Sequence, residues 1–252
     1  MQENNNLYKG IILAGGAGTR LHPITKAVSK QLLPIYDNPM IYHPLSTLIN
    51  SGIKEILIIT TEEDVGLFKK LLSNGEEWGV KIDYATQKKP EGIAQSLIIA
   101  EKWLNGCKSI LILGDNLFFG PDLPLLMQNA KNNNHGATIF CYEVSDPERF
   151  GVIEIDKDNN ILAIDEKPKE PKSRWAITGL YIYDENASTI AKDLKKSERG
   201  EYEITDLNRQ YLEQKNLNVV YLDKDYSWLD TGTHETLLEA SNFVKDNGIK
   251  LK

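Results

Sequence analysis

The segment GIILAGGAGTRL, residues 10–21, joins a short apolar run to a cluster of glycines followed by an arginine. The run GIILA is β-branched and nearly continuous, which predicts a strand covered on both faces. The glycines differ from two phosphate-binding motifs. A dinucleotide fingerprint needs a third glycine three residues after the second, where this chain has Leu21, and the Gly-Lys-Ser/Thr ending of a Walker loop is absent from the sequence.

The glycine segment keeps two interpretations. Adjacent glycines after a strand leave backbone N–H groups that can approach a triphosphate closely, and Arg20 would add a fixed cationic fork. An ordinary turn with a surface arginine fits the same residues equally well. This segment alone does not distinguish a phosphate-binding loop from an ordinary turn.

Outward from this segment, strands and helices alternate. Further strand-like runs are EILIIT (55–60), SILILGD (109–115) and ATIFCYEV (137–144). Apolar residues at three- and four-residue spacing predict helices over residues 40–51, 63–74, 93–104 and 122–133. The first two-thirds of the chain is therefore expected to be βαβ-like.

From Phe150 the pattern changes. GVIEI and ILAID flank the turn DKDNN and predict a hairpin, and AITGLYIYD predicts a further strand before two helical stretches. We expect an α/β fold with a largely parallel mixed central sheet and inserted hairpins. Residues 1–6 are expected to be a disordered tail, and residues 7–252 a single domain.

Composition excludes several classes of protein. The 252 residues carry 26% charged and 41% hydrophobic residues, and no apolar run approaches the ~20 residues that span a bilayer. The polar start MQENNN does not resemble a secretory signal, so we expect a cytoplasmic protein without a membrane partner. The net charge of −7 argues against nucleic-acid binding. Cys107 and Cys141 fit no metal or redox spacing and are expected to be reduced.

Two carboxylates follow apolar runs at distant points of the chain. Asp115 ends LILGD, and Asp230 lies in WLDTGTH, before a predicted turn into the last helix. Strand ends of an open α/β sheet border its ligand crevice, and two carboxylates there suit an octahedral Mg²⁺ that keeps waters and bridges substrate oxygens. Asp230 has an alternative role as a helix cap near Thr233. The four histidines, His22, His43, His135 and His234, lack a metal spacing.

Several separated motifs closely resemble the sugar-phosphate nucleotidyltransferases, and among these the glucose-1-phosphate thymidylyltransferases. They are GGAGTRL, SKQLLPIYDNPMIYHPLSTL, QKKPEGIAQS, LGDNLFFG, DPERFGV, EKPKEPKSRWAITGLYIYD, RGEYEITDLN and WLDTGTHETLLEA, in the family's order and at roughly its spacing. The resemblance implies a three-layer α/β/α, Rossmann-like nucleotidyltransferase fold. It also implies Mg²⁺-dependent transfer of dTMP from dTTP to glucose 1-phosphate, which releases pyrophosphate and feeds deoxysugar (dTDP-rhamnose type) synthesis.

The resemblance also assigns roles to residues. Arg20, Lys30 and Lys167 would be catalytic, with Arg20 and Lys30 on the triphosphate and Lys167 on the acceptor phosphate. Asp115 and Asp230 would hold the metal. The nucleotide would contact Leu13, Gly15, Gly16, Gly18, Thr19, Arg20, Gln87, Gly92 and Asp115. The sugar phosphate would contact Asn116, Gly151, Glu166, Lys167 and Ile177. Phe150 stands where many members carry tyrosine, so a phenolic hydrogen bond is not expected there.

Two alternatives to this function stay open. The Gln87 amide would read the pyrimidine, but a glutamine suits thymine and uracil equally, and in the reversed orientation suits cytosine, so a uridylyl- or cytidylyltransferase is a rival. A sensor that binds sugar nucleotides without catalysis is a rival of another class. Trp175 could stack on a base or sugar, or belong to the core.

The resemblance bears on assembly and control as well. It implies a homo-oligomer, a dimer or a tetramer. Many members continue for a few dozen residues beyond the point corresponding to LLEASNFVKDNGIKLK and use those residues to build a second, regulatory nucleotide site. We therefore expect weak feedback control in this chain.

Overall fold

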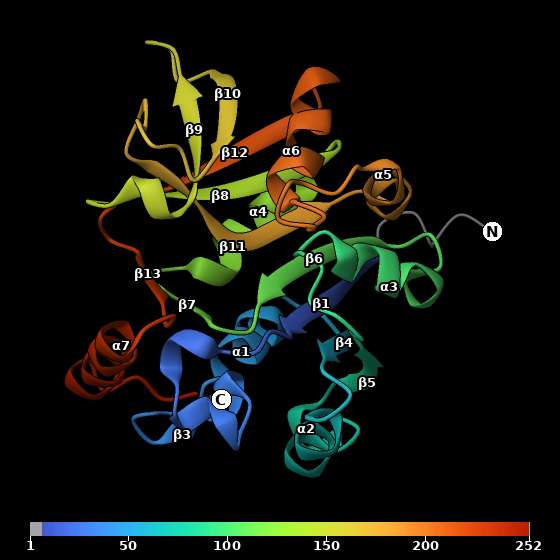
Figure 1. Ribbon diagram of the computed structural model, residues 1–252, viewed down its shortest axis with the longest axis vertical. Helices are drawn as coiled ribbons and strands as arrows, with labels where there is room; N and C mark the ends of the chain where they lie inside the picture. Colours follow the sequence, from blue (N-terminus) through green and yellow to red (C-terminus); the bar gives the residue numbers. More distant parts are fainter. Residues whose placement is uncertain (1–6, 252) are drawn as a thin grey trace.

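The computed structural model describes residues 7–251 (Figure 1), so the disorder expected of residues 1–6 lies outside the described residues. A nine-stranded mixed sheet organises the fold. Its strands are β1 (Tyr8–Ala14), β4 (Glu55–Thr60), β5 (Lys81–Thr86), β6 (Lys108–Leu113), β8 (Ala137–Glu143), β9 (Gly151–Ile155), β10 (Ile161–Glu166), β11 (Trp175–Tyr183) and β12 (Leu217–Leu222).

The centre of the sheet is parallel. Strands β6, β1, β4 and β5 lie side by side in that order, all in the same direction. The long strand β11 runs antiparallel to β6 and continues the sheet to β8 and β12, and its N-terminal part also pairs with the β9–β10 hairpin. The prediction of a largely parallel mixed sheet with an inserted hairpin is confirmed.

Helices cover both faces of this sheet. They are α1 (Tyr42–Asn50), α2 (Val65–Leu72), α3 (Gln95–Leu104), α4 (Leu123–Asn132), α5 (Ala187–Asp193) and α6 (Ile204–Glu213), whereas α7 (His234–Asp246) lies against the short strands beside the sheet. The first four fall within the predicted helical ranges. Each of those ranges is one or two residues too long at one or both ends, because the apolar spacing marks the buried face and not the terminal residues.

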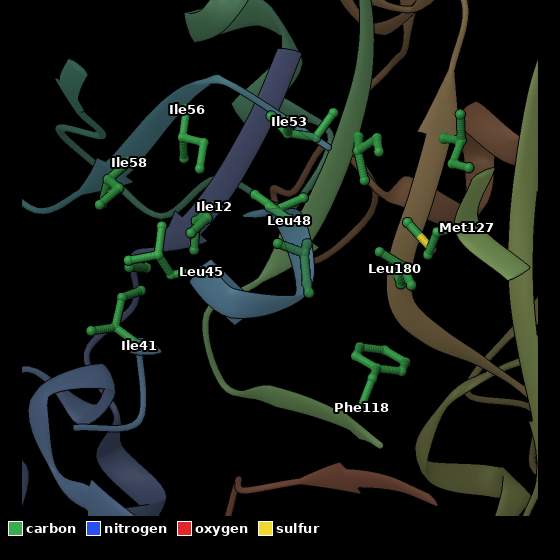
Figure 2. Packing of buried hydrophobic residues seen from close by; sticks show 14 of the residues in the cluster. Ile12, Ile41, Leu45, Leu48, Ile53, Ile56, Ile58, Phe118, Met127 and Leu180 are labelled. Carbon is green, nitrogen blue, oxygen red and sulfur yellow. The ribbon is translucent and has the colours of Figure 1, made fainter. Parts of the chain in front are cut away.

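Alternate residues of the central strands enter two separate cores. Ile12 of β1 belongs to a core that also contains side chains of α1, α2 and α4. Figure 2 labels Leu45 and Leu48 of α1 and Met127 of α4 in this core. Its neighbour Ile11 faces the other side, in a core formed with α3, α5 and α6. Since both faces of the strands are buried, their sequences are continuous apolar runs. The resulting three layers agree with the fold class predicted from the sequence.

Four short strands lie beside the main sheet. They are β2 (Pro34–Ile35), β3 (Asn38–Pro39), β7 (Asn116–Phe119) and β13 (Ser227–Asp230). β13 pairs antiparallel with β7, so the segment before the last helix returns to the segment just after β6. Helix α7 packs against this region through Ala240 and Val244, in a third, smaller core with Ile35, Met40 and Leu117.

The order of the strands creates a crevice. The chain leaves β1 through α1 to β4 on one side, passes to β5, and then returns through α3 to β6 on the other side of β1. Connections that diverge from neighbouring parallel strands leave a gap at their carboxyl ends, where α/β sheets bind ligands. Here that gap lies beyond Ala14 and Leu113. Among residues 7–251 the structure contains no helix of the length and apolarity that crossing a membrane requires.

Candidate active site

A cavity of about 670 Å³ opens at the carboxyl ends of β1 and β6. Its walls also come from the segment after β5, from β9 to β11, from the start of α6 and from β13. Most of the residues predicted to form a site line it: Leu13, Gly15, Gly16, Arg20, Gln87, Gly92, Asp115, Asn116, Gly151, Glu166, Lys167, Ile177 and Asp230. Gly18, Thr19 and Lys30 do not line it. Residues from distant parts of the sequence thus meet at the strand ends.

The glycine segment after β1 passes close to the segment after β5. A Cβ atom at Gly15 would lie 2.5 Å from Gln87 Oε1, so a larger residue there would require the Gln87 side chain to move. Gly18 lies deeper in the turn, where the hydroxyl of Thr25 donates to its carbonyl oxygen at 2.7 Å. Thr19 begins a 3₁₀ turn and is exposed. Among the glycines of this segment, Gly15 and Gly16 are therefore the ones that line the cavity.

Arg20 belongs to the same 3₁₀ turn and reaches the turn before α7. A Cβ atom at Gly232 would lie 2.8 Å from an Arg20 guanidinium nitrogen, so the guanidinium rests on that backbone. Among the described residues, no carboxylate lies within ion-pair distance of Arg20. Its charge is therefore available at the mouth of the cavity.

Asp115 is held at both of its carboxylate oxygens. One carboxylate oxygen forms an ion pair with Lys30, and the other accepts a hydrogen bond from Asn116 Nδ2 at 3.0 Å. Burial acts to raise the pKa of Asp115, but the charge and hydrogen bond of Lys30, together with the hydrogen bonds from Asn116 and the backbone, hold the pKa below its ordinary value. Lys30 itself is buried in a 3₁₀ turn. Asp115 is thus held in its charged form by a lysine behind the cavity wall.

Asp230 lies opposite the residues that follow β6. It pairs with Asn116 in the β13–β7 ladder, and the next residue, Thr231, donates to the Asp115 carbonyl oxygen from its backbone N–H (3.1 Å) and its hydroxyl (2.8 Å). Burial, and then repulsion from Asp115, raise the pKa of Asp230 to about 6. The alternative of a helix cap is wrong, because Thr233 caps α7 by accepting from the backbone N–H of Thr236.

The Asp115–Asp230 pair fits a divalent cation. The side chains of the two aspartates are 17% and 18% exposed. Two such carboxylates that repel each other are stabilised when a cation shares them, and Mg²⁺ takes one or two carboxylates together with water and substrate oxygens. Among the described residues, no group of three or more His, Cys, Asp or Glu side chains could hold a metal. A cation at this pair would therefore take its remaining ligands from water or from substrate.

The opposite wall carries a second set of charges. Glu166 Oε2 accepts from the Thr205 hydroxyl at 2.5 Å, and Glu166 Oε1 pairs with Arg199 at 3.3 Å and with Lys167 at 3.6 Å. Lys167 is half exposed and its backbone has a positive φ of 46°. Gly151 leaves space beside Glu166. This wall offers hydrogen-bond acceptors and cations toward the cavity.

Asn116 joins the two walls. Its Oδ1 accepts from the Trp228 indole N–H at 2.6 Å and from the backbone N–H of Gly179 at 3.1 Å, while its Nδ2 donates to Asp115. In the reversed orientation the amide nitrogen would face these two N–H donors. The contacts therefore fix the orientation of the Asn116 amide. Asn116 therefore has one N–H left for a ligand.

Sequence reasoning gave no role to several charged or polar residues that line the cavity. Arg149 pairs with Asp146 at 2.6 Å and with Asp230 at 3.6 Å, and lies over the Phe150 ring. Arg199, Thr205 and Trp228 also line the cavity. The family-like motifs DPERFGV, RGEYEITDLN and WLDTG contain all four residues. The motifs therefore contained these residues, but the sequence pattern alone did not show which groups each residue contacts.

Other residues discussed from the sequence lie away from the cavity or act in its wall. Trp175 packs edge-on against Tyr221 at 4.8 Å between ring centroids, outside the cavity. The Phe150 ring lines the cavity against Trp228. Cys107 and Cys141 are free thiols, and burial raises the pKa of Cys141. These outcomes agree with the core reading of Trp175 and with two reduced cysteines.

Comparison with known proteins gives consistent results. The model of the nucleotidyl transferase family matches residues 9–247. A glucose-1-phosphate thymidylyltransferase of Neisseria gonorrhoeae is 54% identical over 94% of this chain and 82% of its own length, and one of Mycolicibacterium smegmatis is 50% identical over the same shares. A crystal structure from Bacillus anthracis, in complex with a sucrose and described provisionally as a glucose-1-phosphate thymidylyltransferase, is 43% identical. It superposes with a TM-score of 0.90 over 97% of both chains.

Proposed function

Because this chain belongs to the nucleotidyl transferase family, we propose that it transfers dTMP from dTTP to glucose 1-phosphate, forming dTDP-glucose and releasing pyrophosphate. The observation that carries the proposal is the identity of 54% to a glucose-1-phosphate thymidylyltransferase over 94% of the chain. The cavity supports it, since it brings carboxylates and cations together at the strand ends. We also propose that the protein forms a homo-oligomer, and only the family resemblance supports this proposal.

The acceptor supplies its own nucleophile. The second pKa of a phosphate monoester lies near ~6, so the phosphate of glucose 1-phosphate is mostly a dianion at neutral pH and needs no general base. One of its oxygens bonds to the α-phosphorus of dTTP as the bond to the β-phosphate breaks and pyrophosphate leaves. The protein has to hold two anions together in line and stabilise the leaving charge.

The cations of the cavity suit that task. In this proposal Arg20, at the mouth beside Gly232, contacts the triphosphate and the departing pyrophosphate, and Gly15, Gly16 and Leu13 border the phosphates with their backbone. Gly18 and Thr19 shape the same segment. Lys167 binds the phosphate of the sugar. Lys30 acts through Asp115, whose negative charge it maintains.

Asp115 and Asp230 would hold Mg²⁺. Bound there, the ion would neutralise phosphate oxygens and act as an electrostatic template for the transfer. Lys30 and Asn116 orient Asp115, and the Thr231 contacts keep Asp230 beside it. Asn116, Gly151, Glu166 and Ile177 form the proposed glucose site, with the Glu166 carboxylate as the hydroxyl acceptor. Gln87 and Gly92 border the proposed base site.

A pyrophosphate-release assay tests the proposal. Purified protein with Mg²⁺, dTTP and glucose 1-phosphate should release pyrophosphate, with UTP accepted less well. Product analysis by phosphorus NMR should show dTDP-glucose in equal amount. Binding of nucleotides without turnover, under every triphosphate and sugar 1-phosphate tried, would favour the sensor.

A further inference from the structure

The side chain of Gln87 faces the cavity from a fixed backbone. Gln87 follows β5, is 5% exposed, and its backbone N–H donates to the Thr60 carbonyl oxygen at 2.7 Å. Its side chain reaches Gly15, where a Cβ atom would lie 2.5 Å from Gln87 Oε1. A glutamine amide has a donor end and an acceptor end. Which end faces the cavity decides which hydrogen-bonding edge of a base it can bind.

Gln95, at the start of α3, admits one amide orientation. Its Nε2 donates to the Glu91 carboxylate at 2.9 Å, and its Oε1 accepts from the Glu91 backbone N–H at 3.2 Å. A carboxylate only accepts and a backbone N–H only donates. Reversing the Gln95 amide would therefore place acceptor against acceptor and donor against donor, so the network fixes its orientation.

The orientation of the Gln95 amide in turn fixes the orientation of the Gln87 amide. Gln87 Nε2 donates to Gln95 Oε1 at 2.6 Å and points to the Gly92 carbonyl oxygen at 3.5 Å. Both partners only accept, so a reversed Gln87 would set its own oxygen against two acceptors. Gln87 Oε1 accepts no hydrogen bond from residues 7–251. Gln87 thus presents an acceptor to the cavity, while its N–H groups point into the protein.

The far end of this network is anchored. Lys196 pairs with the Glu91 carboxylate at 2.6 Å. The Tyr202 backbone N–H donates to the Glu91 carbonyl oxygen at 2.7 Å, and the Tyr202 carbonyl oxygen accepts from Ala94 at 3.2 Å. Gly92 has a φ of +100°, and a Cβ atom there would lie 2.4 Å from the Tyr202 carbonyl oxygen. The segment that carries Glu91 is therefore held against the segment before α6.

We propose that Gln95 and Glu91 are positioning residues that fix Gln87 as an acceptor for the N3–H of a thymine or uracil base and so exclude cytosine. The N3 of cytosine is itself an acceptor and would face Gln87 Oε1 without a proton between them. The inference deepens the proposed function and rests on it, since it takes Gln87 as the residue that reads the base. Glu91, Gln95 and Gln87 form a hydrogen-bond relay in which the first two decide what the third can bind.

The test measures the ratio of kcat/KM with dTTP to kcat/KM with CTP. Gln95→Leu releases the Gln87 amide, so the ratio should fall about tenfold or more, chiefly through better use of CTP, while UTP follows dTTP. Glu91→Leu should act in the same way. Glu91→Gln can still accept from Gln95 and should keep most of the ratio. Gln210→Leu, an exposed glutamine on α6, serves as the matched control and should leave the ratio unchanged.

A double variant separates positioning from general structure. In a Gln87→Ala background, Gln95→Leu should have no further effect on the ratio, because the residue that it positions is gone. The relay would be wrong if Gln95→Leu lowered kcat/KM equally for all three triphosphates. It would also be wrong if Gln95→Leu lowered the ratio of dTTP to CTP in the Gln87→Ala background.

Calorimetric binding of dTTP and CTP reads the same preference without turnover. If the wild-type protein turns over dTTP and Gln95→Leu leaves the ratio unchanged, the relay is wrong and the proposed transferase activity stands. Wild-type protein that binds dTTP far more tightly than CTP but turns over neither would sink the transferase, and loss of that preference in Gln95→Leu would support the relay.

Discussion

Two cavities of similar size differ in how their polar groups are held. In the cavity at the strand ends, of about 670 Å³, Asp115 is paired with Lys30, Glu166 with Arg199, and Asn116 holds three hydrogen bonds. A second cavity of about 540 Å³ lies between α1, β7 and α7, where both ring nitrogens of His43 and the hydroxyl of Ser46 lack a hydrogen-bond partner among the described residues.

The difference is consistent with the catalytic role proposed for the first cavity. Size does not separate the two, and both carry polar residues. The first holds Asp115, Asn116 and Glu166 in fixed positions before any substrate arrives, and such preorganised groups stabilise a transition state without rearranging. The second has polar atoms that no hydrogen bond from residues 7–251 orients. The predictions below test this contrast, from the largest expected effect to the smallest.

The largest effect is expected at the carboxylates of the first cavity. Asp115→Asn and Asp230→Asn should each slow turnover by ~10²-fold or more and weaken its dependence on Mg²⁺, as loss of an electrostatic stabiliser commonly does. Ser46→Ala, in the second cavity, should leave turnover unchanged. Steady-state pyrophosphate release over a range of Mg²⁺ concentrations measures all three. Equal activity of the three variants would show that the contrast is misplaced.

The same two variants should differ in stability. Asp115→Asn removes the partner of a buried lysine and should destabilise the protein by about 3 kcal/mol. Asp230 carries a pKa raised by burial and by Asp115, so its charge is unfavourable in the folded state, and Asp230→Asn should cost little or stabilise. Urea denaturation separates the outcomes.

The next effect separates the two substrate walls. Lys167→Ala should raise KM for glucose 1-phosphate about tenfold or more with a smaller change for dTTP, and Arg20→Ala should do the reverse, because each removes a cation from one bound anion. Lys70→Ala, on the exposed side of α2, is the control. Equal and small effects from both variants would mean that these cations do not contact the substrates.

A smaller effect is expected at the glycine segment. In Gly15→Ala the new methyl group would lie 2.5 Å from Gln87 Oε1, and that amide cannot turn away without losing its partners. We expect an increase of about tenfold in KM for dTTP, equivalent to roughly 1.4 kcal/mol. Gly66→Ala on α2 meets no atom within 4 Å and should not change KM. An unchanged KM in Gly15→Ala would show that Gln87 can move freely.

Local sequence patterns predicted the frame of this site well. The strands and the first helices follow from apolar spacing. Asp115 follows a strand of the main sheet as expected, but Asp230 ends β13, which lies outside that sheet and reaches Asp115 by pairing with β7. The fold class was therefore accessible from the sequence. That residues 7–252 form one domain stays a prediction.

The contacts that orient the site could not be predicted from the sequence. Lys30 lies 85 positions from Asp115, and Arg199 lies 33 positions from Glu166. No local pattern encodes such pairs, because they depend on how the 3₁₀ turns and the segment before α6 close over the sheet. The direction of the Gln87 amide likewise depends on Gln95 and Glu91, which a spacing rule does not connect to it.

The smallest effect concerns His43 and is a dependence of stability on pH. Burial lowers the pKa of His43 to about 4, whereas the unfolded chain has the ordinary value near ~6.5. Between these values the unfolded chain binds a proton that the folded chain does not, so the free energy of unfolding falls as the pH falls through this window. From pH 7 to pH 5.5 the loss should be roughly 1 kcal/mol from this residue.

Two variants isolate that contribution. His43→Leu removes a buried titrating ring whose nitrogens have no partner among the described residues, so it should lose about 1 kcal/mol less stability over this pH interval than the wild type does. His135→Leu, which changes an exposed histidine, should keep the wild-type dependence. Urea denaturation at both pH values gives the comparison. If His43→Leu loses as much stability as the wild type, the second cavity admits charge as readily as the first, and the contrast between them fails.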